Sequence, residues 1–238
     1  MGAAKALIEK QLAANPNDPN MLLMSAQTYN ALGDAFAMEK ALKKTVEVDP
    51  QSLQAYAMLG KMYYQQGRLD LARRELETFV GRAPTSVPAN TMLGTILELQ
   101  GKKDEAKVRY NKALQTDPRA AVAANNLAWI DSNSNGNLDV ALQLAQTAKA
   151  QLPSRHEVDD TLGWIYYKKG LSSMAVESLK TSTQRAPDNP SYNYHLALAY
   201  HQNGNKAEAR KYLEKALASK TAFDGADEAR KLLESIKG

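Results

Sequence analysis

The 238-residue sequence contains no cysteine, few aromatic residues other than tyrosine, and no long apolar run. The absence of cysteine excludes a disulfide framework and a thiolate metal site, and it is compatible with an oxidising or a reducing compartment. The first eleven residues include Lys5, Glu9 and Lys10, and they hold no apolar stretch of secretory or membrane length. We therefore expect no membrane span, and we expect any signal peptide to precede this sequence.

Residues typical of active sites are also few. Of the three histidines, His195 and His201 are six residues apart, which is about 240° around a helix, so they cannot share a metal ion as an i, i+4 pair would. The sequence has no glycine-rich phosphate loop and no nucleophile motif. The adjacent Asp159 and Asp160 fall at an expected helix start, where complementing the helix dipole is a simpler role than acid–base chemistry. We expect no catalytic residues, no metal site and no cofactor.

Positive charge is not concentrated anywhere in the chain. Thirty Lys and Arg residues are opposed by 26 Asp and Glu residues, for a net charge of +4, and both signs occur throughout. Because nucleic-acid binding requires a basic patch or stripe, this distribution predicts no nucleic-acid partner.

What the sequence does have is a period of 34 residues, with a single step of 35. One ladder of equivalent residues consists of Gly33, Gly67, Gly101, Gly136, Gly170 and Gly204. A ladder of small residues consists of Ala26, Gly60, Gly94, Ala128, Gly163 and Ala197. Such a fixed period predicts an array of stacked units, each in contact mainly with its neighbours.

Each period is expected to form two helices. In residues 53–86 the first helix is expected over 53–66 and the second over 69–82. Gly67 can take the left-handed conformation that often ends a helix, and Pro84 closes the unit because it cannot continue a helix interior. Gly60 and its equivalents are expected where the two helices approach closely. The sequence thus predicts an all-α solenoid of tandem helix–turn–helix repeats.

The expected boundaries follow from the ladders. Six full repeats are placed at 19–52, 53–86, 87–120, 121–155, 156–189 and 190–223. Residues 1–18 correspond to the second helix of a truncated repeat, so we expect the natural protein to continue upstream. Residues 224–238 are expected to form a capping helix, because an array must cover the open end of its core.

This pattern resembles the tetratricopeptide repeat family. The residues that carry the resemblance are Tyr56, Leu59, Gly60, Tyr63, Ala72 and Pro84. The resemblance implies a right-handed superhelix whose concave groove binds a protein or peptide, acting as a non-enzymatic scaffold.

A narrower resemblance lies in the C-terminal half, in the segments 125–129, 160–164, 194–197 and 223–226. These segments are similar to bacterial cell-envelope repeat proteins, notably the lipoproteins that accompany exosortase and exopolysaccharide gene clusters. This resemblance implies a periplasmic or envelope location. Without it, a cytoplasmic location stays open.

Candidate binding residues follow from the helical period. If the small residue of each repeat is position 8, positions 2, 5, 9, 12 and 13 lie opposite the core face, and in the family that side lines the groove. In the fourth to sixth repeats these positions include Asn125, Trp129, Asp160, Trp164, Tyr167, Tyr194 and His201. Aromatic rings mixed with amide and carboxylate groups suit peptide recognition. Alternatively, Trp129 and Trp164 only seal one repeat against the next.

Two other binding chemistries are disfavoured. Positions 2, 5 and 6 hold no Lys or Arg, which excludes the carboxylate clamp of the family's chaperone-binding members. The segment from Asp131 to Asp139 imitates a calcium loop at Asp131, Asn133, Asn135 and Gly136. Its twelfth position is the apolar Leu142, so an elongated helix–helix turn is the favoured interpretation.

Two alternatives to a peptide-binding scaffold remain open. The first is a structural spacer or a self-assembly module, associating through the exposed half-repeat at residues 2–14. The second is the recruiting arm of an envelope enzyme whose catalytic part lies outside this chain.

Overall fold

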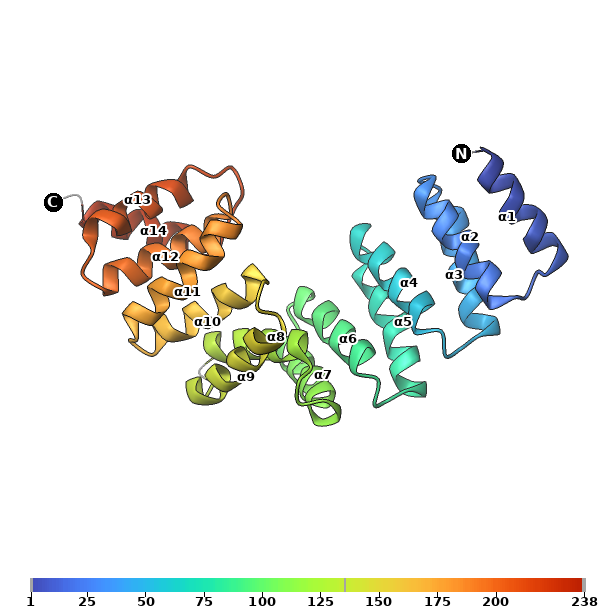
Figure 1. Cartoon of the computed structure of the whole chain (residues 1–238), viewed down its shortest axis with the longest axis horizontal. Coiled ribbons are helices and arrows are strands. Elements are labelled where there is room, and N and C mark those ends of the chain that lie inside the picture. The colour runs from blue at the N-terminus through green and yellow to red at the C-terminus, as the bar shows by residue number, and fades with distance from the viewer. Residues whose placement is uncertain (1, 135, 237–238) are drawn as a thin grey trace. The chain divides into compact units, whose positions relative to one another are not determined.

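The computed structural model describes residues 2–134 and 136–236, and these residues form fourteen α-helices and no strand. They divide into two compact units, residues 1–118 and 119–238 (Figure 1). Unit 1 holds α1 (Gly2–Ala14), α2 (Pro19–Ala31), α3 (Ala35–Val48), α4 (Leu53–Gln65), α5 (Leu69–Arg82), α6 (Val87–Leu99) and α7 (Lys103–Thr116). Unit 2 holds α8 (Ala121–Asn133), α9 (Leu138–Gln151), α10 (His156–Lys168), α11 (Ser172–Arg185), α12 (Pro190–Gln202), α13 (Lys206–Leu217) and α14 (Ala226–Ser235).

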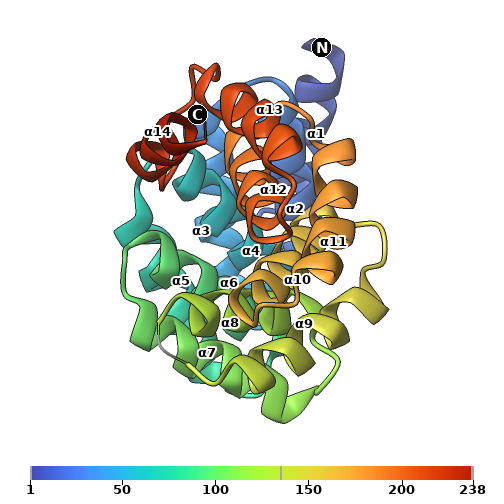
Figure 2. The same ribbon diagram turned by 90° about the vertical axis from the view of Figure 1, so that its left-hand side faces the viewer.

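Within each unit the helices form antiparallel hairpins that pack in chain order. The hairpins are α2–α3, α4–α5 and α6–α7 in unit 1, and α8–α9, α10–α11 and α12–α13 in unit 2. Figure 2 shows α14 beside α13 at the end of unit 2. The predicted fold class, an all-α array of tandem helix–turn–helix repeats, is therefore confirmed.

Glycine shapes the turn inside five of the six hairpins. Gly67 has φ 69°, and Gly33, Gly101, Gly170 and Gly204 have φ between 73° and 78°, a region that other residues rarely enter. Gly136, in the repeat with the extra residue, is not among the positive-φ glycines. Glycine is needed there for a different reason, because a Cβ at residue 136 would lie 2.7 Å from the carbonyl oxygen of Asp131.

The ladder of small residues marks the closest approach of the two helices in a hairpin. A Cβ built on Gly94 would lie 2.5 Å from the Tyr110 ring, and one on Gly163 would lie 2.5 Å from Leu179. Gly60 differs, because a Cβ built on it would lie 3.7 Å from Leu76, at ordinary van der Waals distance. Gly60 and Gly163 both face a leucine, so the room at position 8 depends on how closely the two helices pack and not on side-chain size alone.

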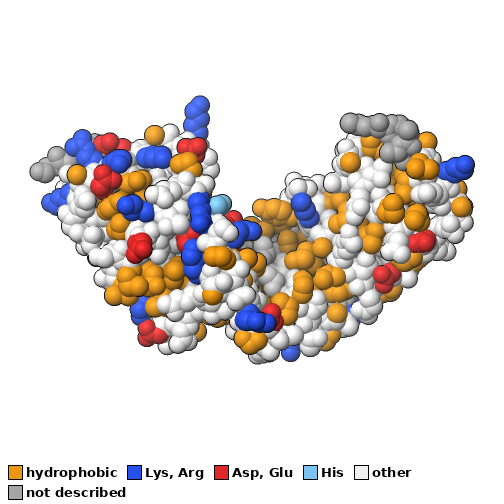
Figure 3. Space-filling model, viewed as in Figure 1, with side chains coloured by type: hydrophobic (Ala, Val, Ile, Leu, Met, Phe, Trp, Pro, Cys, Tyr) orange, Lys and Arg blue, Asp and Glu red, His pale blue; other side chains and the backbone are white. Residues whose placement is uncertain are grey.

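The C-terminal helix α14 covers the end of unit 2. Ala229 is fully buried against α13, and Leu232, Leu233 and Ile236 pack partly buried on the same cluster. The side chains that face solvent in unit 2 carry both charges, and Lys and Arg are interspersed with Asp and Glu on the face drawn in Figure 3. In the part of the chain that is described, no helix is both long and apolar enough to cross a membrane.

The glycine ladder generates a test of packing. Gly94→Ala should destabilise the protein by about 1–3 kcal/mol, because the added methyl must displace the buried Tyr110 ring. The matched change Gly60→Ala should instead stabilise it by about 0.5–1 kcal/mol, since the site has room and alanine favours the helix. Urea unfolding followed by circular dichroism measures both. Equal effects of the two substitutions would contradict the packing explanation.

Candidate aromatic binding site in unit 2

The first helices of unit 2 bring a continuous series of rings together. We call these rings the aromatic run; its members are Trp129, Trp164, Tyr167, His195, Tyr194 and Phe223. The Trp129 and Trp164 centroids are 6.3 Å apart, and the Trp164 centroid is 5.2 Å from Tyr167 and 4.4 Å from His195. Tyr194 lies 6.1 Å from His195 and 5.6 Å from Phe223. The run therefore links α8, α10, α12 and the linker before α14.

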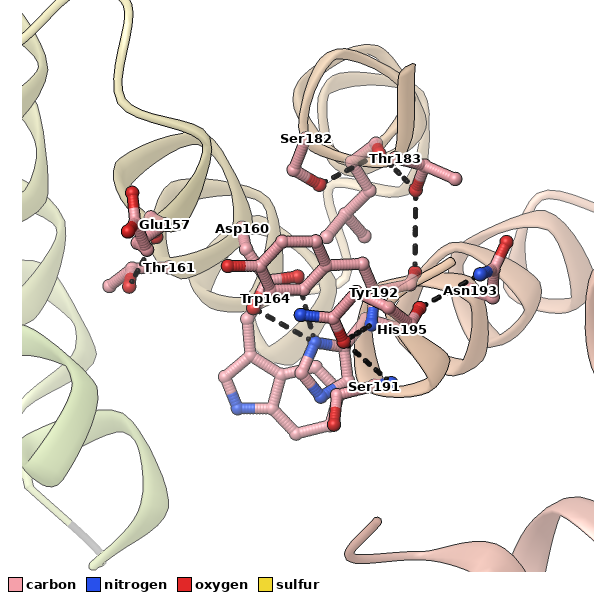
Figure 4. A network of polar contacts seen from close by, with 12 residues as sticks. Glu157, Asp160, Thr161, Trp164, Ser182, Thr183, Ser191, Tyr192, Asn193 and His195 are labelled. Carbon is pink, nitrogen blue, oxygen red and sulfur yellow. Dashed lines mark hydrogen bonds and ion pairs between the residues drawn. The ribbon is translucent and has the colours of Figure 1, made fainter. Parts of the chain in front are cut away.

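A buried, hydrogen-bonded Asp–His pair lies at the centre of the run. Nδ1 of His195 on α12 is 2.9 Å and 3.1 Å from the two carboxylate oxygens of Asp160 on α10. Asp160 is 5% exposed and His195 is 7% exposed, and Figure 4 shows the imidazole between Asp160 and Trp164. Because a buried carboxylate is costly without a partner, this pair fixes α12 against α10.

Trp164 makes contacts typical of a packing residue. It is only 9% exposed, and its indole Nε1 donates a hydrogen bond to Oδ1 of Asn133, on α8 of the preceding repeat, at 3.1 Å. Lys168 places its ammonium 4.8 Å from the indole centroid. Trp164 thus packs between three successive first helices, and the Lys168 ammonium lies over its ring.

Of the other predicted site residues, Tyr194 is only 8% exposed, whereas four are half-buried. Trp129 and Tyr167 are half-buried, and burial raises the pKa of the Tyr167 phenol, so the group stays neutral and able to donate. Oδ1 of Asn125 and Nδ1 of His201 are buried without a hydrogen-bond partner among the described residues. Both atoms are also enclosed by the protein, so neither is exposed to a bound molecule in this structure.

The structure joins five of the seven predicted residues and leaves two apart. Trp129, Trp164, Tyr167 and Tyr194 belong to the aromatic run, and Asp160 binds its central histidine. The ring of His201 contacts no member of the run in the described part of the chain, although it shares α12.

Sequence reasoning missed His195, Asn133 and Phe223. His195 stands at position 6 of its repeat and Asp160 at position 5 of the repeat before. A carboxylate and an imidazole at adjacent positions of consecutive repeats could have predicted this pair from the sequence. The contact of Phe223 with Tyr194 had no such signal, because Phe223 lies in a linker outside the helical period.

The two adjacent aspartates lie near the start of α10, Asp159 in its first turn as expected, and in addition they have different side-chain partners. Asp159 is buried and pairs with Lys149 of α9 and Arg185 of α11, the latter at 3.2 Å. Both cations also donate to the Pro153 carbonyl oxygen, at 2.8 Å and 3.3 Å. Asp159 therefore holds three helices together, while Asp160 serves the aromatic run.

The segment that imitates a calcium loop begins inside a helix. Asp131 and Asn133 lie in the last turn of α8, and the Asn133 side chain is engaged with Trp129 and Trp164. The third candidate ligand, Asn135, lies outside the described residues. Among the residues that are described, no group of His, Cys, Asp and Glu side chains is arranged to hold a metal ion.

Comparison with known families agrees with the repeat geometry. A tetratricopeptide repeat model matches residues 37–87 and 161–233, and a second tetratricopeptide repeat model matches residues 87–119. The chain belongs to the tetratricopeptide repeat family. Tetratricopeptide repeats typically act as non-enzymatic scaffolds that bind protein or peptide partners. No curated protein matches the chain significantly.

Several solved structures share this tetratricopeptide repeat fold. The chain resembles a chain of the APC/C hetero-tetramer Cut9–Hcn1 with a TM-score of 0.77 and 16% identity, covering 99% of this chain and 46% of that one. It resembles PilW, a type IV pilus biogenesis factor, with a TM-score of 0.69 and 16% identity over 92% and 98% of the two chains. It also resembles YrrB, a repeat protein with an unusual peptide-binding site, with a TM-score of 0.60 and 20% identity. That match covers 83% of this chain and 97% of the YrrB chain. At these identities the likeness shows the fold alone.

The buried pair generates a stability test with a matched control. His195→Leu should destabilise the protein by about 3 kcal/mol, because it leaves the Asp160 carboxylate buried and unpaired. His201→Leu on the same helix should change stability by less than about 0.5 kcal/mol, since it removes a nitrogen that has no partner. Urea unfolding of both variants measures the difference. A His195→Leu protein as stable as the control would show that the pair does not join α10 to α12.

Proposed function

We propose that this protein is a non-enzymatic scaffold that binds an extended segment of a partner protein along the aromatic run of unit 2. The observation that carries the proposal is the gathering of rings on the first helices of unit 2, where Trp129 and Tyr167 are only half-buried. Trp129 and Tyr167 offer apolar area at low entropy cost, and the Tyr167 phenol, whose pKa is raised by burial so that it stays neutral, can donate a hydrogen bond.

The roles of the seven predicted residues divide by burial. Asp160, Trp164 and Tyr194 are buried and position the site through the ring contacts and the His195 pair. Asn125, Trp129, Tyr167 and His201 are the half-buried residues that a partner would touch. This division combines the two interpretations of the tryptophans, with Trp164 as the seal and Trp129 as a contact.

The equivalent helices of unit 1 provide an internal comparison. At position 9 the three full repeats of unit 1 have Gln27, Lys61 and Thr95, whereas the first two repeats of unit 2 have tryptophan. Position 12 includes Tyr64, which is 49% exposed and makes no ring contact with another described residue. The concentration of rings in unit 2 therefore favours unit 2 as the binding part.

A role in a bacterial envelope assembly extends this proposal. The segments 125–129 and 160–164, which contain Trp129 and Trp164, are those that resemble cell-envelope repeat proteins. Among solved structures of the same fold are PilW and the Pseudomonas aeruginosa protein PilF. Under this proposal the partner is a protein of the cell envelope, so the envelope fraction is searched first.

Self-association is a second candidate, favoured by one observation. On α1 the side chain of Leu7 is 58% exposed, while its neighbour Ile8 is buried. Sedimentation equilibrium of the wild-type chain and Leu7→Glu tests this candidate. Concentration-dependent dimers that disappear in the variant would support assembly through α1.

The binding proposal is tested by removing the accessible rings. Trp129→Ala and Tyr167→Ala should each weaken partner binding by more than about 1 kcal/mol while preserving helicity, because each removes a ring that contacts the partner. The matched control is Tyr64→Ala, at the position of unit 1 equivalent to Tyr167, which should leave affinity unchanged. Partners are captured from separate envelope and cytoplasmic fractions, and the affinity of the captured protein is then measured by titration calorimetry. Equal affinities for all variants would place binding elsewhere.

A further inference from the structure

The linker before α14 differs from every other linker between repeats. Residues 83–86, 117–120, 152–155 and 186–189 each join two repeats with four residues, whereas residues 218–225 join α13 to α14 with eight. The additional length carries Phe223, one of only three phenylalanines in the chain. This linker is therefore long enough to lie over a neighbouring helix instead of passing directly to the next one.

The longer linker lies against the end of the aromatic run. The Phe223 ring is 5.6 Å from Tyr194, at an angle of 50°. Gly225 has φ 90°, and a Cβ there would lie 2.4 Å from the Tyr194 ring. Tyr194 occupies position 5 of its repeat, as do Asn125 and Asp160 in theirs. Phe223 thus contacts the run where a partner's side chain would have to lie.

The linker is held mainly by side-chain contact. The amide groups of Lys220 and of residues 222–225 donate no hydrogen bond to any described residue, and the Thr221 amide donates only to Ser219 Oγ, at 3.1 Å. The linker 186–189 is fastened differently, because the Asn193 side chain donates to the Pro187 and Asn189 carbonyl oxygens. Lifting residues 220–225 from Tyr194 would therefore break few hydrogen bonds.

We propose that residues 221–225 act as an internal ligand, with Phe223 occupying the place that an aromatic side chain of the partner takes. This inference rests on the proposed peptide-binding function and specifies the partner's chemistry. The partner presents an extended segment whose aromatic residue stacks on Tyr194 and displaces Phe223. Bound partner and bound linker exclude each other, because both use the same face of the Tyr194 ring.

The competition sets the expected effect of removing Phe223. A tethered segment competes at an effective concentration of about millimolar, so its loss should strengthen the binding of a free peptide. The probe is a dye-labelled nonapeptide that copies residues 219–227 and contains one phenylalanine. In fluorescence anisotropy, Phe223→Ala protein should bind this peptide at least about tenfold more tightly than the wild-type protein does.

Two controls establish that the ring and its site are responsible. A peptide with alanine in place of phenylalanine should bind neither protein, and adding Tyr194→Leu to Phe223→Ala should abolish binding of the aromatic peptide. Because Phe223→Ala removes contacts with α14, the Phe223→Leu protein is measured in parallel. It keeps an apolar contact without an aromatic ring and should bind the probe more tightly than wild type.

A second measurement uses the wild-type chain labelled with 4-fluorophenylalanine. Phe36 is 81% exposed on α3 and Phe79 is buried on α5, so the three fluorine signals report three environments. Excess aromatic peptide should shift the Phe223 signal alone. Equal binding to wild type and Phe223→Ala, binding to neither, or peptide binding without a shift of the Phe223 signal would each overturn the proposal.

Failure of this inference is distinguishable from failure of the proposed function. The peptide titration tests the linker alone, whereas capture of a partner with the Trp129→Ala and Tyr167→Ala proteins tests the scaffold role. A partner that depends on Trp129 and Tyr167 but leaves the Phe223 signal unmoved would keep the function and reject the internal ligand.

Discussion

The close approach of the two helices in each hairpin is the constraint on which the rest of the structure depends. Gly94 and Gly163 leave room for a buried Tyr110 or Leu179 side chain directly against the backbone of the first helix. Within each unit, successive hairpins then pack on one another in chain order. Stacking then places equivalent positions of successive first helices within contact of one another.

Unit 2 uses this stacking to bury charge. Asp160 meets His195 across two consecutive repeats, and Asp159 holds cations from α9 and α11. Burying these groups costs free energy of solvation, which the opposite charge and the hydrogen bonds offset. The contact of His195 with Asp160 and the packing of its imidazole on Trp164 together align α12 with α10.

The aromatic run combines rigidity with accessibility. Its centre, at Trp164 and His195, is buried and is held by contacts with three helices. Its accessible rings are Trp129 and Tyr167, and one end is covered by Phe223 from the only long linker between repeats. Under the proposed function, rings that are already in place would lower the ordering cost of binding.

The sequence by itself determined the repeat, the helix hairpins and the positions of the turns. The glycine, proline and small-residue ladders are local requirements that every repeat must meet, so they can be read from spacing. Only the tertiary structure decided which rings of the candidate site are buried, that His195 completes it, and that Phe223 covers it. Those outcomes depend on contacts between residues of different repeats, such as Asp160 with His195 and Tyr194 with Phe223. A periodic pattern places each of these side chains on a helix face, but it does not say what the neighbouring repeat brings against it.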